Sequence, residues 1–219
     1  MRRLSSGPVG VSSHPVKEKR NILLPVLMML VLASTRFMIG VLPQNFSPIY
    51  ALAFCGAVYF SGRMAWWLPL GTLLATDIIL NVFCYGISPL GWFMLTNYLG
   101  FGLIILVGRR FKPGDSLVKL LGGGIVGAIL FYLITNTASW MSSSVYAKTL
   151  AGWIQALTVG EPGYPPTWEF FRNTLMSGGL FTGLFAGSMK LAEAAEKPEP
   201  EEEKEPEKAP EAEPEESKS

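Results

Sequence analysis

The chain has 219 residues, of which 49% are hydrophobic and only 16% are charged. Most of the charged residues lie before residue 21 or after residue 189, so a long apolar region separates a basic head from an acidic tail. This distribution excludes an ordinary soluble domain and is typical of a protein that crosses a membrane several times. The net charge of +1 averages the two tails and does not indicate a partner.

Three regions are expected along the chain. Residues 1–20 form a basic head and residues 192–219 an acidic tail, and both are predicted to be disordered because they lack apolar periodicity. Residues 21–191 form an all-α, six-helix membrane domain. The first apolar run can also be read as a signal-peptide core with a cleavage site near Ala33 and Ser34.

Six apolar runs predict the membrane helices, and polar or Pro-containing breaks separate them. Pro48 can open the second helix, and Asp115 or Ser116 can cap the fifth. Residues 142–169 are polar, but an apolar stripe within them indicates a short surface helix that includes Trp153. The six expected helices cover about 22–42, 48–60, 63–85, 90–107, 116–141 and 170–191.

The basic residues predict the orientation of these helices. With six spans, both termini and most of the Lys and Arg residues fall on one side. The opposite side receives only Arg36, Lys148 and Arg172. By the positive-inside rule, both termini are expected in the cytoplasm, with the protein in the bacterial cytoplasmic (inner) membrane.

Asp77 is the most unusual residue of the apolar region. A carboxylate near the centre of a bilayer costs about 2.5 to 3.5 kcal/mol, so such a residue normally faces the interior of a bundle or a wet cavity. Counting 1.5 Å per residue places it about 20 Å from the cytoplasmic surface of a core about 30 Å thick. Asp77 is therefore expected to pair with Arg36 or Arg172.

Other polar and aromatic residues share this outer depth, and together they predict an outward-opening pocket for a small solute. Asp77 and Asn81 would form its floor, and Trp140 and Trp153 would stack on a planar ligand or close over it. The alternative is a purely structural cluster whose members bond only one another. The predicted substrate-binding residues are Asp77, Asn81, Asn97, Tyr132, Asn136, Trp140, Trp153, Arg172 and Asn173.

Catalytic and cofactor motifs are missing from the sequence. It contains no phosphate-binding loop, no His-Glu-x-x-His, no Gly-x-Ser-x-Gly and no cluster of His and Cys ligands. Cys55 and Cys84 lack the spacing of a metal site and are interpreted as small buried hydrophobes. No enzyme activity, cofactor, metal or nucleic-acid partner is therefore expected, and energised transport would need a partner that hydrolyses ATP.

Several motifs resemble a family of uncharacterised bacterial membrane proteins, which is similar to the substrate-binding S components of energy-coupling factor (ECF) transporters. The motifs are Asn45-Phe-Ser-Pro-Ile-Tyr-Ala-Leu-Ala-Phe, Trp67-Leu-Pro-Leu-Gly-Thr-Leu-Leu-Ala-Thr-Asp77, Thr135-Asn136-Thr137, Tyr146-Ala-Lys-Thr-Leu-Ala-Gly152 and Phe170-Phe-Arg-Asn-Thr-Leu175. They cover roughly residues 22–190. The Ala-x-x-x-Ala motif that S components carry on their first helix is missing from 22–42, and its nearest match is Ala53 to Ala57.

The resemblance implies a six-helix protein that binds a vitamin or another micronutrient from outside. Such a protein would deliver its solute through a transmembrane coupling protein and two cytosolic ATPases. A membrane scaffold or assembly protein, which transports nothing, is the alternative function.

Overall fold

The computed structural model describes residues 22–89 and 91–196, so the predicted basic head and nearly all of the acidic tail lie outside the described residues. The described part contains helices and no strand, which confirms the all-α class. Its elements are α1 (Leu23–Ser34), η1 (Thr35–Phe37), α2 (Ile49–Tyr59), α3 (Met64–Ile79), η2 (Leu80–Cys84), α4 (Trp92–Gly108), α5 (Leu117–Ser142), α6 (Leu150–Thr158) and α7 (Thr167–Ala195).

Most of the predicted helices are present near their expected bounds. Ser116 caps α5, because its hydroxyl accepts a hydrogen bond from the backbone N–H of Lys119. The short helix expected around Trp153 is α6. The last helix is longer than predicted and continues through residues 192–195.

The first apolar run was predicted as a helix as far as residue 42, and that prediction was wrong. The α-helix ends at Ser34, and the 3₁₀ turn η1 ends at Phe37. Gly40 then has a φ of +76°, a left-handed conformation that a continuing helix cannot contain. The apolar character of 38–42 therefore belongs to a loop that leads to α2.

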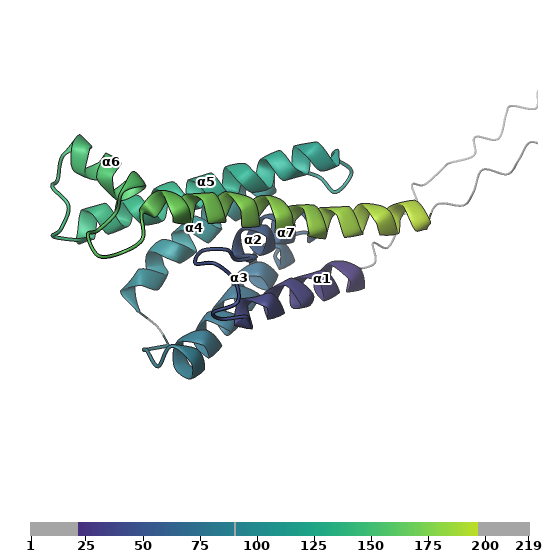
Figure 1. The fold of residues 1–219 in the computed structure, drawn as a ribbon. Helices are drawn as coiled ribbons and strands as arrows, with labels where there is room; N and C mark the ends of the chain where they lie inside the picture. Colours follow the sequence, from purple (N-terminus) through teal and green to yellow (C-terminus); the bar gives the residue numbers. More distant parts are fainter. Residues whose placement is uncertain (1–21, 90, 197–219) are drawn as a thin grey trace, which may run out of the picture.

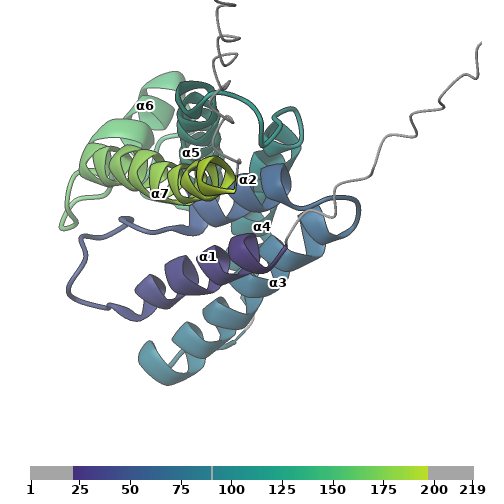
Figure 2. The same ribbon diagram turned by 90° about the vertical axis from the view of Figure 1, so that its right-hand side faces the viewer.

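The short helix α2 forms the centre of the bundle. It packs against α1, α3, α4, α5 and α7, and nearly every one of its side chains is buried. Figure 2 shows α2 with α5, α6 and α7 on one side and α1 and α3 on the other. The contact with α3 needs Gly56, because a Cβ at this position would lie 2.9 Å from the ring of Pro69.

The charged loops gather at one end of the bundle, here called the basic end. Arg109 donates to the carbonyl of Gly62 at 3.4 Å, and Lys190 donates to the carbonyl of Pro113 at 3.4 Å. These contacts join the loop before α3, the loop between α4 and α5, and the end of α7. The start of α1 and the end of α7 lie at the same end (Figure 1).

The opposite end is here called the cap end. It consists of the loop 38–48 and the segment 143–166. This segment contains α6, which lies across the ends of α5 and α7 (Figure 1). Asn173 of α7 donates to the carbonyl of Gln44 at 2.9 Å, which joins the first of these segments to α7.

Two helical segments of the described chain are long and apolar enough to cross a membrane. These are Met64–Cys84, which comprises α3 and η2, and Leu117–Ser142, which is α5. Three further apolar helices are shorter, at Leu23–Phe37, Ile49–Tyr59 and Phe93–Gly108. Length and composition thus give weak evidence for a membrane location.

Candidate functional site

A largely buried ion pair joins Asp77 of α3 to Arg36 of η1. Nη2 of Arg36 contacts Oδ1 of Asp77, and the two side chains are only 11% and 16% exposed. Nη1 of Arg36 donates to the hydroxyl of Thr76 and to the carbonyl of Leu73. Tyr98 of α4 donates its hydroxyl to Oδ2 of Asp77 at 3.0 Å. Both carboxylate oxygens are therefore engaged, and they link η1, α3 and α4.

Of the two arginines predicted as partners of Asp77, the structure selects Arg36. The guanidinium of Arg172 instead lies over the ring of Trp168, with 5.5 Å between Cζ and the ring centroid. Its Nε also donates to Oδ1 of the neighbouring Asn173 at 3.5 Å. Arg172 therefore belongs to the cap end and contributes no charge to Asp77.

Hydrogen bonds from aromatic side chains connect α6 to α5 and α7. Tyr132 of α5 donates its hydroxyl to the carbonyls of Leu157 and Thr167. Trp153 of α6 donates its indole N–H to the hydroxyl of Thr137 at 2.9 Å. Two of the predicted site residues thus hold α6 in place.

The loop between α5 and α6 folds back onto the end of α5. Trp140 donates its indole N–H to the carbonyl of Ala147 at 2.8 Å, and Lys148 donates to the carbonyl of Trp140. Tyr146 belongs to this loop, and its side chain is buried. Burial raises its pKa above the ordinary value of a tyrosine, and the carboxylate of Glu161 acts in the same direction, so Tyr146 is neutral at physiological pH.

Three of the four predicted asparagines, Asn81, Asn97 and Asn136, differ in their surroundings. Asn136 is half-buried, and its amide donates at 2.9 Å to the carbonyl of Tyr132, one turn earlier in the same helix. Asn81 is buried and donates to the carbonyl of Pro89 at 3.4 Å. Asn97 is half-buried on α4, directly before Tyr98. None of these bonds joins Asp77 to Asn136.

Seven of the nine predicted site residues therefore fall into two groups, and Asn81 and Asn97 belong to neither. Asp77 belongs to an ion-pair group with Arg36, Thr76 and Tyr98. The members of the second group are here called the cap cluster, and its predicted residues are Tyr132, Asn136, Trp140, Trp153, Arg172 and Asn173. The expectation of a shared pocket floor at Asp77 finds no support in these contacts.

A groove of about 480 Å³ lies between α1 and α3, and Thr76 of the ion-pair group is part of its lining. It is lined by Leu30, Ala33, Ser34, Phe37, Trp67, Leu68, Gly71, Thr72, Ala75, Thr76 and Ile79, and none of the nine predicted site residues is among them. The sequence reasoning missed this groove and also missed Tyr98. The signal for the groove was the pair of small residues Gly71 and Ala75, four positions apart on α3.

The described residues contain no group of three or more His, Cys, Asp or Glu side chains that could hold a metal ion. The cap cluster offers hydrogen bonding, aromatic side chains and the positive charge of Arg172.

Comparison with curated proteins and with solved structures finds no match to this chain. The similarity to S components of ECF transporters consequently stays a prediction. The resemblance to an uncharacterised family is confirmed, because residues 16–201 match the model described as "Family of unknown function (DUF6580)". The chain belongs to the DUF6580 family.

Proposed function

We propose that this protein is a multipass membrane protein that captures a small polar or aromatic solute at its cap end, in the manner of an S component. The cap end would face outward and the basic end the cytoplasm, in accord with the excess of basic residues in the loops of the basic end. Uptake would require a transmembrane coupling protein and cytosolic ATPases, since the chain has no phosphate-binding loop.

The observation that carries this proposal is the placement of Asn136. An asparagine that holds transmembrane helices together donates to a neighbouring helix. Asn136 donates to its own helix, although it lies half-buried on the same face as Tyr132 and Trp140. Its amide is therefore not required for helix packing, and it lies where a solute below α6 would meet it.

The ion-pair group favours a second candidate function, a membrane scaffold or assembly protein. Asp77 is bonded by Arg36 and Tyr98 and needs no ligand to compensate its charge. If the cap cluster serves packing in the same way, the protein binds no solute and its role lies in contacts with other membrane proteins.

Binding to the purified full-length chain distinguishes the two candidates. We expect one member of a panel of vitamins and nucleobases to change the tryptophan fluorescence, because Trp140 and Trp153 are both in the cap cluster. Asn136→Leu should weaken this binding at least tenfold, since a hydrogen bond worth about 1.5 kcal/mol is lost, while the melting temperature in detergent stays near that of the parent.

Thr158→Leu is the matched control, because the hydroxyl of Thr158 also donates to its own helix, to the carbonyl of Ile154, but is exposed. This variant should bind like the parent. If no compound of the panel changes the fluorescence, or if the two variants bind equally well, the scaffold function is favoured instead.

A further inference from the structure

The groove between α1 and α3 has an apolar lining despite its hydroxyl groups. The hydroxyl of Ser34 donates to the carbonyl of Val31 at 2.7 Å, and that of Thr76 donates to the carbonyl of Thr72 at 2.9 Å. Both are thus used within their own helices. Apart from the hydroxyl of Thr72, the remaining side chains of the lining are hydrocarbon or aromatic, which suits an apolar occupant better than a polar solute.

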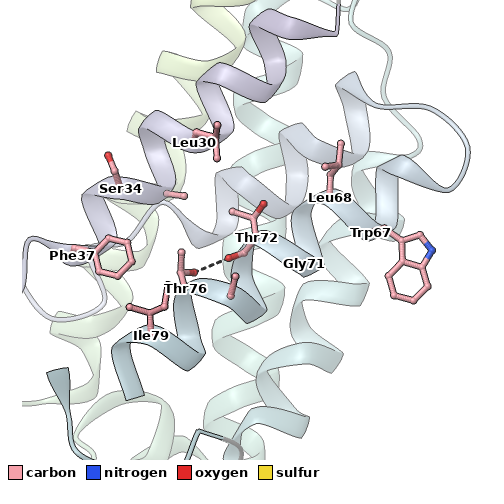
Figure 3. A pocket seen from close by; sticks show the side chains of 11 residues that line it. Leu30, Ser34, Phe37, Trp67, Leu68, Gly71, Thr72, Thr76 and Ile79 are labelled. Atoms are coloured by element: carbon pink, nitrogen blue, oxygen red, sulfur yellow. Dashed lines mark hydrogen bonds between the residues drawn. The ribbon is translucent and has the colours of Figure 1, made fainter. Parts of the chain in front are cut away.

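Small side chains create the groove. Ala33 of α1 and Gly71 and Ala75 of α3 line it, and a Cβ added at Gly71 would meet nothing within 4 Å. Larger apolar side chains surround them, and Figure 3 shows the groove running along α3 from Trp67 and Leu68 to Ile79. Trp67 is 74% exposed, so it lies on the outer surface of the bundle.

A cation lies at the basic end of this groove. Arg63 precedes Trp67 by four residues and therefore lies one helical turn nearer the basic end on the same face. Its guanidinium is exposed, and no hydrogen bond or ion pair with another described residue involves it. A tryptophan beside an exposed arginine is the arrangement expected at the headgroup level of a membrane.

We infer that the groove between α1 and α3 binds one acyl chain of an anionic phospholipid whose phosphate contacts Arg63. The acyl chain covers Ala33, Gly71 and Ala75, and the indole of Trp67 lies at the level of the headgroup. The lipid comes from the cytoplasmic leaflet, because Arg63 belongs to the basic end. This inference rests on the proposed membrane location but not on solute capture.

Native mass spectrometry of the full-length chain in detergent tests the inference with two probes, phosphatidylglycerol and phosphatidylcholine. The parent should retain one phospholipid molecule per chain. The phosphatidylglycerol adduct should be about fivefold more abundant than the phosphatidylcholine adduct, because one arginine at the headgroup level favours an anionic lipid by about this factor. Gly71→Leu should remove both adducts, because the new side chain fills the groove. Arg63→Gln should lower phosphatidylglycerol to the level of phosphatidylcholine.

Two matched controls keep the test specific. Gly102→Leu places the same side chain in open space on α4, and Arg110→Gln removes another exposed cation of the basic end, so both should bind like the parent. Unchanged melting temperatures of all four variants show that the fold is retained. Equal retention of the two lipids by the parent, or retention of lipid by Gly71→Leu, would overturn the inference.

Two other outcomes would overturn it as well. If inorganic phosphate abolished the excess of the phosphatidylglycerol adduct over the phosphatidylcholine adduct, the chain would bind phosphate alone. A dimer of the chain that disappears in Gly71→Leu would show that the groove holds a second copy. Neither result bears on the solute-binding measurement, so the two proposals fail independently.

Discussion

Asp77→Leu should lower the free energy of unfolding by about 3 to 5 kcal/mol, the cost of removing one partner from a buried ion pair. The guanidinium of Arg36 would keep its contacts with Thr76 and Leu73 but would lose its counter-ion in surroundings that leave it only 11% exposed. The hydroxyl of Tyr98 would lose its acceptor at the same time. Unfolding by SDS in mixed detergent micelles measures this change.

Two further variants test whether the lower free energy of unfolding of Asp77→Leu comes from the broken ion pair. Arg36→Leu combined with Asp77→Leu should recover most of the stability, because a buried pair can be replaced by apolar side chains at little cost. Lys119→Leu removes the exposed ion pair with Asp115 and should unfold like the parent. If Asp77→Leu also unfolds like the parent, the ion pair does not stabilise the bundle.

Phe54→Ala should destabilise the bundle by a similar amount, about 3 to 5 kcal/mol, because it leaves a cavity in the centre. Phe54 is fully buried on α2, and its ring lies 5.2 Å from that of Phe111. A Cβ at Gly123 would lie 2.5 Å from this ring, so α5 is packed directly against it. The same SDS titration provides the measurement.

Phe83→Ala is the matched control for this prediction. Phe83 is 79% exposed in η2, so its removal leaves no internal cavity and should not change the free energy of unfolding. Equal losses for the two phenylalanine variants would mean that α2 is not the packing centre of the bundle.

The sequence predicted most helices because apolar runs and their breaks are local features. The cap at Ser116 and the short helix α6 follow from neighbouring residues alone. The end of the first helix was missed because the apolar pattern does not stop where the helix does. Apolar residues continue to Leu42, but the helical conformation ends at Phe37 and Gly40 has a φ of +76°.

For the candidate site, depth in a membrane fixes the height of a residue but not the side of the bundle on which it lies, so the sequence could not show which of the predicted residues contact one another. Asp77 and Asn136 were assigned to one pocket by depth, yet their contacts belong to different groups. Tyr98 has no local signal that separates it from the other aromatic residues of α4. The choice between Arg36 and Arg172 likewise required the packing of the helices.

In the proposed orientation, the chain spans the membrane with the cap end outside and the basic end in the cytoplasm. Single cysteines introduced in a Cys84→Ser background test it most directly, since the native Cys84 is exposed and would itself react. Ser144 lies exposed in the cap-end loop, and Gly114 lies at the basic end, where a Cβ meets nothing within 4 Å.

An impermeant thiol reagent applied to intact cells, and to cells made permeable as a control, provides the measurement. We predict labelling of Ser144→Cys in both preparations, and labelling of Gly114→Cys only after the membrane is opened. Labelling of Gly114→Cys in intact cells, or protection of Ser144→Cys until the membrane is opened, would contradict the proposed orientation and with it the capture of a solute from outside.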